Sequence, residues 1–244
     1  MNRHIFEEKK QFHKYSDRLI PVSVRLPLIL VLLWNGIAYY GGRVISQNRL
    51  HHCFETGLDR SIPFVPWTVS VYLVSFLFWT VNYCLAARRD RTDAYRLFCA
   101  DFITRMVCLA FFVLLPTTNI RPAVPGNDIW AQLMRMVYRL DAADNMFPSI
   151  HCIASFLAAA GISGEKDIPA WYRCFSWLMA GAICISTLTT KQHVMADVIG
   201  ALLIESAAYG IAARTAIQNS YSRMVGRIAC LLRRIFGIPD TEDD

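Results

Sequence analysis

The hydrophobic residues of this chain are gathered into long blocks that are separated by short polar stretches. The clearest block is the uncharged run from 64 to 87, which is long enough to cross a bilayer with some tilt. Further blocks predict five more membrane-spanning helices, at 26–45, 97–115, 148–163, 171–189 and 193–213. The block at 148–163 is shorter than the roughly 20 residues that a crossing needs, so we expect its N-terminus to be recessed.

The composition agrees with this pattern. Hydrophobic residues make up 55% of the chain and charged residues only 18%, a balance that is atypical of a soluble domain of this length. We therefore predict an all-α fold, an integral membrane bundle of six transmembrane helices formed by residues 26–213. A polar N-terminal segment, 1–25, precedes the bundle and a tail, 214–244, follows it. The N-terminal segment contains acidic residues and no cleavage site follows it, which favours an uncleaved anchor over a signal peptide.

The distribution of basic residues predicts the orientation of the bundle. With six spans both chain ends lie on one side, and that side carries 17 of the 25 lysine and arginine residues, against seven on the other. Because the basic side of a membrane protein is normally cytoplasmic, we expect both termini in the cytoplasm. The loops after the first, third and fifth spans are then expected to face outward.

The tail contains apolar residues at helical spacing, with arginines among them, from 214 to 236. This pattern leaves two interpretations open: an amphipathic helix on the inner leaflet, or a linear continuation of the last span. The acidic ending, 240–244, is expected to be disordered. We expect the protein to interact with the membrane bilayer and with a lipid substrate. We expect no nucleic-acid partner.

Candidate chemistry begins with the stretch 186–201, STLTTKQHVMADVIGA, in which His193 and Asp197 are four residues apart at the start of an apolar block. Residues at this spacing share one face of a helix, so Asp197 can accept the proton of one imidazole nitrogen and leave the other nitrogen free. A histidine held in this way can act as a nucleophile or a base. On its own, the same pair is also consistent with a structural role in helix packing.

Two further polar pieces precede this stretch. The sequence FPSIHC, 147–152, places Ser149 and His151 directly after a proline that suits the first turn of a helix, where unpaired backbone amides favour a phosphate group. Upstream, Arg121 lies in a proline-bounded loop, and a guanidinium binds phosphate oxygens in a fork. Two predicted spans separate FPSIHC from the His-Asp pair, so all the pieces are expected on the outer face.

In this order, the Arg-Pro pair at 121–122, the PSxH sequence at 148–151 and the HxxxD sequence at 193–197 resemble the three motifs of the type 2 phosphatidic acid phosphatase superfamily of membrane lipid phosphatases. The resemblance covers residues 116–201. The TKQHxxxDVIG form is more similar to the branch of small bacterial lipid phosphatases, with inositol phosphorylceramide synthases as more distant relatives. The resemblance implies a protein of the bacterial cytoplasmic membrane.

The chain departs from the family pattern at two positions that carry cations. The first motif, KxxxxxxRP, has lysine where this chain has Leu114, and the third, SRxxxxxHxxxD, has arginine where it has Thr187. Lys191 is a candidate replacement for one of these cations, and Arg135 or Arg139 for the other. These changes agree with phosphohistidine chemistry but leave the substrate open.

We hypothesise a phosphohistidine mechanism at this composite site. His193 is expected to attack phosphorus while Asp197 fixes its tautomer, and His151 is expected to protonate the leaving oxygen and then to activate water. Phosphoryl oxygens would be bound by the backbone amides at the start of the fourth span and by three side chains, those of Arg121, Lys191 and Ser149. We expect neither a metal ion nor a cofactor.

The predicted activity is hydrolysis of a lipid phosphate or diphosphate at the outer membrane face, by a phosphoric monoester hydrolase. By resemblance, the candidate substrates are phosphatidic acid, phosphatidylglycerol phosphate and polyprenyl diphosphate. One alternative is a lipid phosphotransferase that passes the phosphoryl or headgroup to an alcohol; short outer loops favour water as the acceptor. The other is a non-catalytic phospholipid binder or transporter, which would not need the His-Asp pair.

Two ionisable residues lie deep within predicted spans. Arg105 in the third span and Glu205 in the sixth are at matching depths, so we predict a structural ion pair between them, with a proton relay as the alternative. The eight cysteines include no CxxC pair, and most fall within spans, where they are expected to pack as small apolar residues.

Overall fold

A computed structural model describes residues 20–237 of the chain, and almost all of its regular structure is helical. Within these residues, four helical stretches are long and apolar enough to cross a membrane: Val22–Ser46, Pro66–Ala87, Arg91–Leu114 and Met195–Arg214. The predictions for residues 1–19 and 238–244 lie outside the described part of the chain.

The first stretch consists of α2 (Val22–Gly36), the π-helical turn η1 (Ile37–Gly41) and α3 (Gly42–Ser46). The second consists of the 3-10 turn η2 (Pro66–Thr68) and α5 (Val69–Ala87), the third is α6 (Arg91–Leu114), and the fourth is α10 (Met195–Arg214). Two more helices coincide with the predicted blocks at 148–163 and 171–189. They are α8 (Ile150–Ser163), which is apolar but has only 14 residues, and α9 (Ala170–Thr189).

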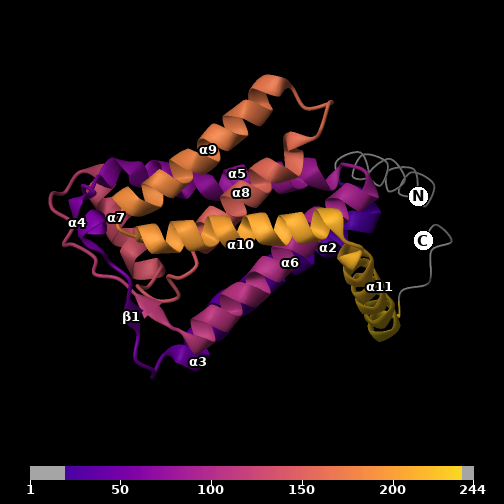
Figure 1. Ribbon diagram of the computed structural model, residues 1–244, viewed down its shortest axis with the longest axis horizontal. Helices are drawn as coiled ribbons and strands as arrows, with labels where there is room; N and C mark the ends of the chain where they lie inside the picture. The colour runs from indigo at the N-terminus through magenta and orange to yellow at the C-terminus, as the bar shows by residue number, and fades with distance from the viewer. Residues whose placement is uncertain (1–19, 238–244) are drawn as a thin grey trace, which may run out of the picture.

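Short elements gather at one end of the long helices (Figure 1). They are β1 (His52–Cys53), α4 (Gly57–Ser61), β2 (Thr117–Thr118) and the amphipathic helix α7 (Ile129–Leu140). The strands β1 and β2 pair in parallel, with His52 opposite Thr117, and so connect the loop after the first stretch to the loop that contains Arg121. The helix α11 (Ile217–Phe236) lies at the other end.

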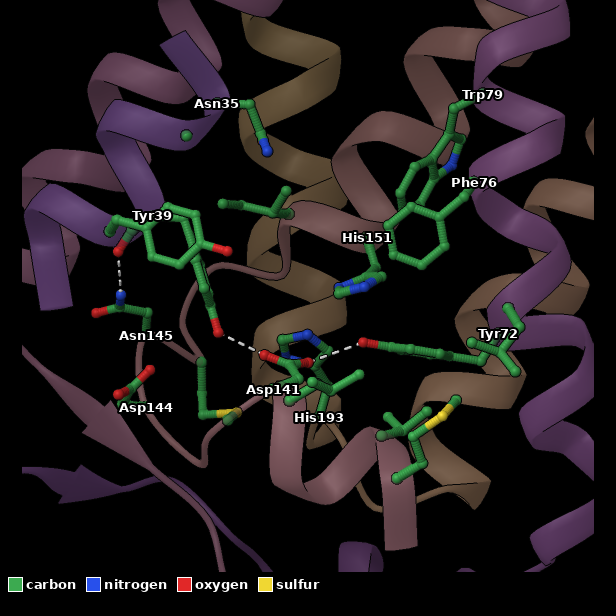
Figure 2. A pocket seen from close by; sticks show the side chains of 18 residues that line it. Asn35, Tyr39, Tyr72, Phe76, Trp79, Asp141, Asp144, Asn145, His151 and His193 are labelled. Carbon is green, nitrogen blue, oxygen red and sulfur yellow. Dashed lines mark hydrogen bonds between the residues drawn. The ribbon is translucent and has the colours of Figure 1, made fainter. Parts of the chain in front are cut away.

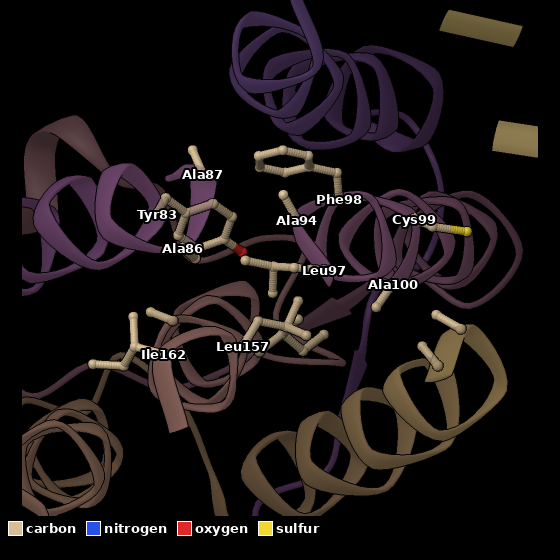
Figure 3. Packing of buried hydrophobic residues seen from close by; sticks show 14 of the residues in the cluster. Tyr83, Ala86, Ala87, Ala94, Leu97, Phe98, Cys99, Ala100, Leu157 and Ile162 are labelled. Atoms are coloured by element: carbon tan, nitrogen blue, oxygen red, sulfur yellow. The ribbon is translucent and has the colours of Figure 1, made fainter. Parts of the chain in front are cut away.

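Small residues let the long helices approach one another closely. The cluster in Figure 3 joins α5, α6 and α8 through residues such as Ala86, Ala94 and Leu157. A Cβ added at Gly161 of α8 would lie 2.7 Å from a methyl group of Leu97 in α6, so this crossing leaves no room for a larger residue. These contacts fix the position of α8, which carries His151.

Several predicted helix starts were wrong by a few residues, and the first helical stretch begins at Val22, before the predicted 26. The helix α6 begins at Arg91, before the predicted 97, because the Asp90 carboxylate accepts the backbone N–H of Thr92 (3.0 Å) and caps a charged first turn. The helices α8 and α10 begin two residues after the predicted starts at 148 and 193. In both cases a capping interaction, described below, sets the start of the helix.

The predicted ion pair between Arg105 and Glu205 was also wrong. Within the described residues Arg105 instead pairs with Asp101, one turn earlier on α6, at 3.0 Å between Nη2 and Oδ1. The Tyr83 hydroxyl donates to the same carboxylate oxygen at 2.7 Å. The Glu205 carboxylate accepts the Ser206 hydroxyl at 3.3 Å. The partner that shares a helix face is therefore preferred to the one at equal depth on a neighbouring helix.

The tail forms a separate helix. The helix α10 ends at Arg214 and α11 begins at Ile217, and Figure 1 shows α11 leaving at a steep angle to α10. One face of α11 packs on α6, where Tyr221 and Val225 are buried, and the arginines lie on other faces. The linear continuation was therefore wrong, because α11 is a separate amphipathic helix. Its predicted position on the inner leaflet stays a prediction.

Candidate active site

His193 and Asp197 form a buried pair at the start of α10. The distance from His193 Nδ1 to Asp197 Oδ2 is 3.1 Å, and the side chains are 7% and 1% exposed. His193 is not in the helix, because Asp197 Oδ2 also accepts the backbone N–H of Val194 (3.0 Å) and caps the helix from inside its first turn. This arrangement fixes the imidazole with Nδ1 toward the carboxylate, so that Nε2 is the nitrogen left for chemistry.

The environment of His193 favours a basic imidazole. Burial alone would lower the pKa of His193, but the hydrogen bond and the negative charge of Asp197 outweigh it, and the pKa lies above the usual value of 6.5. The pair therefore has the arrangement of an activated nucleophile or base and its orienting carboxylate.

His151 faces His193 from the first turn of α8. Their ring centroids are 5.8 Å apart. The rings of Tyr72, Trp79 and Phe76, all from α5, surround His151 with centroids at 4.6, 5.5 and 6.2 Å (Figure 2). The structure thus brings two predicted residues from distant segments to one place, and three aromatic rings pack around the imidazole of His151.

Ser149 connects these two helices. Its hydroxyl accepts the backbone N–H of Cys152 at 3.3 Å, which caps α8, and its own backbone N–H donates to the carbonyl oxygen of Asp197 at 3.2 Å. The side chain is fully buried. Ser149 therefore lies beside the His-Asp pair and holds the start of α8 against α10.

Arg121 reaches the same region from the loop after β2. Its guanidinium donates to the backbone carbonyls of Asp141 and Ala142 and to Gln192 Oε1, and it lies 4.8 Å over the ring of Tyr138. Burial lowers the pKa of Arg121, although the negative charge of Asp141 opposes this effect. The guanidinium is thus fixed next to the residue that precedes His193.

Lys191 has a different environment from the one predicted for a phosphate ligand. Its ammonium donates to the backbone carbonyls of Asp59 (2.7 Å) and Ile62 (2.6 Å), in and just after α4. Asp59 Oδ1 in turn accepts the backbone N–H of Met195 at 2.7 Å. Lys191 and Asp59 together attach the α4 loop to the turn that carries His193.

The other candidate cations also lie away from the His-Asp pair. Arg135 donates to the backbone carbonyls of Val124 and Gly126, and Arg139 is exposed on α7. The apolar side chain of Leu114 is 73% exposed, and the hydroxyl of the buried Thr187 donates to the carbonyl oxygen of Cys184 at 2.8 Å. Neither side chain replaces the cation of the family motif.

Sequence reasoning missed a carboxylate in this region. Asp141, just after α7, accepts the hydroxyl of Tyr39 from η1 on one oxygen and the hydroxyl of Tyr72 from α5 on the other, the latter at 2.8 Å (Figure 2). Burial would raise the pKa of Asp141, but the charge of nearby His151 and the two hydroxyl donors outweigh it, and the pKa lies below its usual value. Asp141 is therefore an ionised group close to the two histidines.

The segment after Asp141 is bound to the first helix as well. Arg43 pairs with Asp144 at 2.8 Å, and the Asn145 amide donates to the carbonyl of Tyr39 at 2.8 Å. The only sequence signal for these contacts is the polar DAADN run before FPSIHC. Tyr39, which contacts this run, lies in the π-helical turn η1, and such turns are frequent at functional sites.

A pocket of about 310 Å³ opens in front of the two histidines. Figure 2 shows Asp141, His151 and His193 lining it, together with Phe76 and Trp79. Six further lining residues are apolar: Leu73 from α5, Met136, Val137 and Leu140 from α7, Met146 from the loop before α8, and Ile150 from α8. The helix α2 and the turn η1 add Asn35, Gly36, Tyr39 and Tyr40. Within residues 20–237, no three His, Cys, Asp or Glu side chains are grouped so as to hold a metal ion.

The chain is thus a mostly helical protein. Several of its helices are long and apolar enough to cross a membrane, and a pocket lined by His151 and His193 lies at one end of them. No protein-family model, curated protein or solved structure shows a match to it.

Proposed function

We propose that this chain is an integral membrane phosphohydrolase that removes phosphate from a lipid phosphate or diphosphate through a phosphohistidine intermediate. The observation that carries the proposal is the contact between Asp197 and Nδ1 of His193, with His151 facing the same imidazole at 5.8 Å between centroids. The resemblance of the three motifs to the type 2 phosphatidic acid phosphatases supports the same chemistry.

In the first step, Nε2 of His193 attacks phosphorus, and the bond between phosphorus and the lipid oxygen breaks. The leaving oxygen takes a proton from the His151 imidazolium. An ionised Asp141 stabilises that positive charge, and Asp197 stabilises the charge that develops on His193.

In the second step, water attacks the phosphohistidine and gives a proton to His151. The bond between nitrogen and phosphorus breaks, which releases inorganic phosphate and restores neutral His193. Acid-base assistance of this kind typically contributes about 10²–10⁴ in rate.

The apolar lining of the pocket supports a lipid as the substrate. Side chains such as Leu73, Phe76 and Met136 offer an acyl or prenyl chain a surface next to the histidines. We also propose that α8 and α9 complete a bundle of six spans. The termini are then cytoplasmic, which agrees with the distribution of basic residues, and the pocket opens at the outer face.

The proposal is tested by phosphate release from a panel of lipid phosphates in detergent, with EDTA present. We expect release that persists in EDTA and disappears in His193→Ala. The matched control is His52→Ala, because His52 is exposed on β1. Release that is unchanged in His193→Ala would overturn the proposed nucleophile.

A further inference from the structure

Gln192 lies between the two residues of the turn that carry predicted roles, Lys191 and His193. Its backbone N–H and that of His193 both donate to the carbonyl oxygen of Thr187, at 2.9 and 3.0 Å. The side chain of Gln192 is 1% exposed. The same turn therefore fixes the backbone of Gln192 and of the proposed nucleophile, and the buried Gln192 directly precedes His193 in the chain.

The side chain of Gln192 is only half satisfied. Oε1 accepts a hydrogen bond from Nη2 of Arg121, while Nε2, which carries two N–H groups, has no hydrogen-bond partner among the described residues. Nε of Arg121 is likewise buried without a partner in the described part of the chain. Buried hydrogen-bond donors are normally paired. The unpaired donors of Gln192 and Arg121, whose side chains are bonded to each other, therefore indicate a ligand with acceptor atoms for both.

We propose that Gln192 and Arg121 form a clamp for the phosphoryl oxygens, in which the Gln192 amide donates to the group transferred to His193. This inference rests on the proposed function and names a binding residue for it. The family arginine at position 187 is replaced by a buried threonine, and the Lys191 ammonium is held by two carbonyls. Gln192 thus supplies a donor at the site where those two side chains do not.

The clamp has a clear electrostatic character. Arg121 contributes one positive charge, and Gln192 contributes a neutral dipole that is already oriented by its bond to Arg121. Donors that are fixed before the reaction stabilise a pentacoordinate phosphoryl group without reorganisation, and loss of one such donor typically lowers the rate by about 10²–10³.

A structural role for Gln192, in which it only holds Arg121, makes a different prediction for Gln192→Glu. Glutamate keeps the acceptor for Arg121 and strengthens that bond, but it replaces the N–H donor by an anionic oxygen. Gln192→Met removes both functions at similar volume. The two variants together separate donation to the phosphoryl group from support of Arg121.

The experiment measures lipid phosphate hydrolysis and its inhibition by orthovanadate, which resembles the pentacoordinate phosphoryl group. In both variants we expect kcat to fall by about 10²-fold and the vanadate inhibition constant to rise at least about tenfold. Gln132→Glu, the same change on the exposed face of α7, is the control and should leave both quantities unchanged. Melting temperatures in detergent test whether each variant is folded. If Gln192→Met does not fold, the result for Gln192→Glu alone decides between the two roles.

Wild-type kcat and vanadate inhibition in Gln192→Glu, with loss of both in Gln192→Met, would overturn the inference and leave Gln192 as a support for Arg121. That result leaves the proposed function intact. A wild-type protein that hydrolyses no lipid phosphate and binds no vanadate would instead overturn the proposed function and the clamp with it.

Discussion

The backbone N–H of Ser149 donates to the carbonyl oxygen of Asp197 at 3.2 Å, and this bond joins the start of α8 to the start of α10. Ser149 caps the helix that carries His151, and Asp197 orients His193. The distance between the two imidazoles therefore depends on contacts between these two helix ends. Substitutions at these contacts are expected to lower activity in a protein that still folds.

Gly200 is the first such position. A Cβ at Gly200 would lie 2.4 Å from Cε2 of Phe147, so the ring that precedes Ser149 packs directly against the α10 backbone. We expect Gly200→Ala to displace Phe147, to destabilise the protein by about 1–3 kcal/mol and to lower kcat at least about tenfold. Gly210→Ala on the same helix has nothing within 4 Å of the new Cβ and should retain activity. Equal kcat values in the two variants would show that the Phe147 contact does not position the site.

The raised pKa of His193 predicts the acid limb of the pH profile. The nucleophile must be unprotonated at Nε2, so kcat/KM should rise with pH through an apparent value above the usual 6.5. In Asp197→Asn the limb should move to lower pH, because the charge that raises the pKa is lost, and the plateau should fall. If the acid limb of the pH profile does not move in Asp197→Asn, the limb does not report the titration of His193.

The same pKa has a consequence for stability. A group whose pKa is higher in the folded protein stabilises it fully below the unfolded pKa, and this contribution is lost as the pH rises through the folded pKa. The stability difference between the natural protein and His193→Ala should therefore shrink as the pH is raised above about 6.5. Chemical unfolding in detergent at a series of pH values measures this stability difference. A difference that grows with pH would contradict the raised pKa of His193.

Lys191 is expected to support the loop and not to bind substrate. Lys191→Met removes two bonds to backbone carbonyls of the α4 loop and should destabilise the protein by about 1–3 kcal/mol. The vanadate inhibition constant should change less than about threefold, far below the tenfold expected for an oxyanion ligand. Lys166→Met, at an exposed position, controls for loss of charge. A tenfold weaker vanadate inhibition at unchanged stability would restore Lys191 to the phosphate site.

The pair in the middle of α6 predicts a contrast between two carboxylates. Asp101→Asn leaves the buried Arg105 without its charge partner and should destabilise the protein by about 3–5 kcal/mol. Glu205→Gln is the matched change on α10, and it should have a much smaller effect because Glu205 does not pair with Arg105. Melting temperatures in detergent compare the two, and a larger loss in Glu205→Gln would reinstate the pair expected from depth alone.

The sequence was informative where a local pattern determines structure. The long apolar blocks led to the observed helices, and the spacing of His193 and Asp197 led to a contact that the structure contains. Helix starts were less predictable, because the carboxylate of Asp197 caps its own helix and leaves His193 outside it. Such a cap depends on side-chain geometry that periodicity does not encode.

Contacts between distant segments were beyond sequence reasoning. Asp141 binds hydroxyls from η1 and α5, and neither Tyr39 nor Tyr72 has a motif around it. The position of Lys191 depends on backbone carbonyls near residue 60, and carbonyls carry no sequence signal. The partner of Arg105 depends on the rotation of each helix about its axis, which depth in the membrane does not determine.

The central claim is that His193 carries the phosphoryl group, and the most direct measurement is to trap it there. The protein is mixed with a lipid phosphate labelled at phosphorus, quenched in alkali, in which phosphohistidine persists, and digested for mass spectrometry. The account predicts label on His193, none in His193→Ala, and faster loss of label with intact His151 than in His151→Ala. Rapid phosphate release with no labelled histidine, or with the label on another residue, would contradict it.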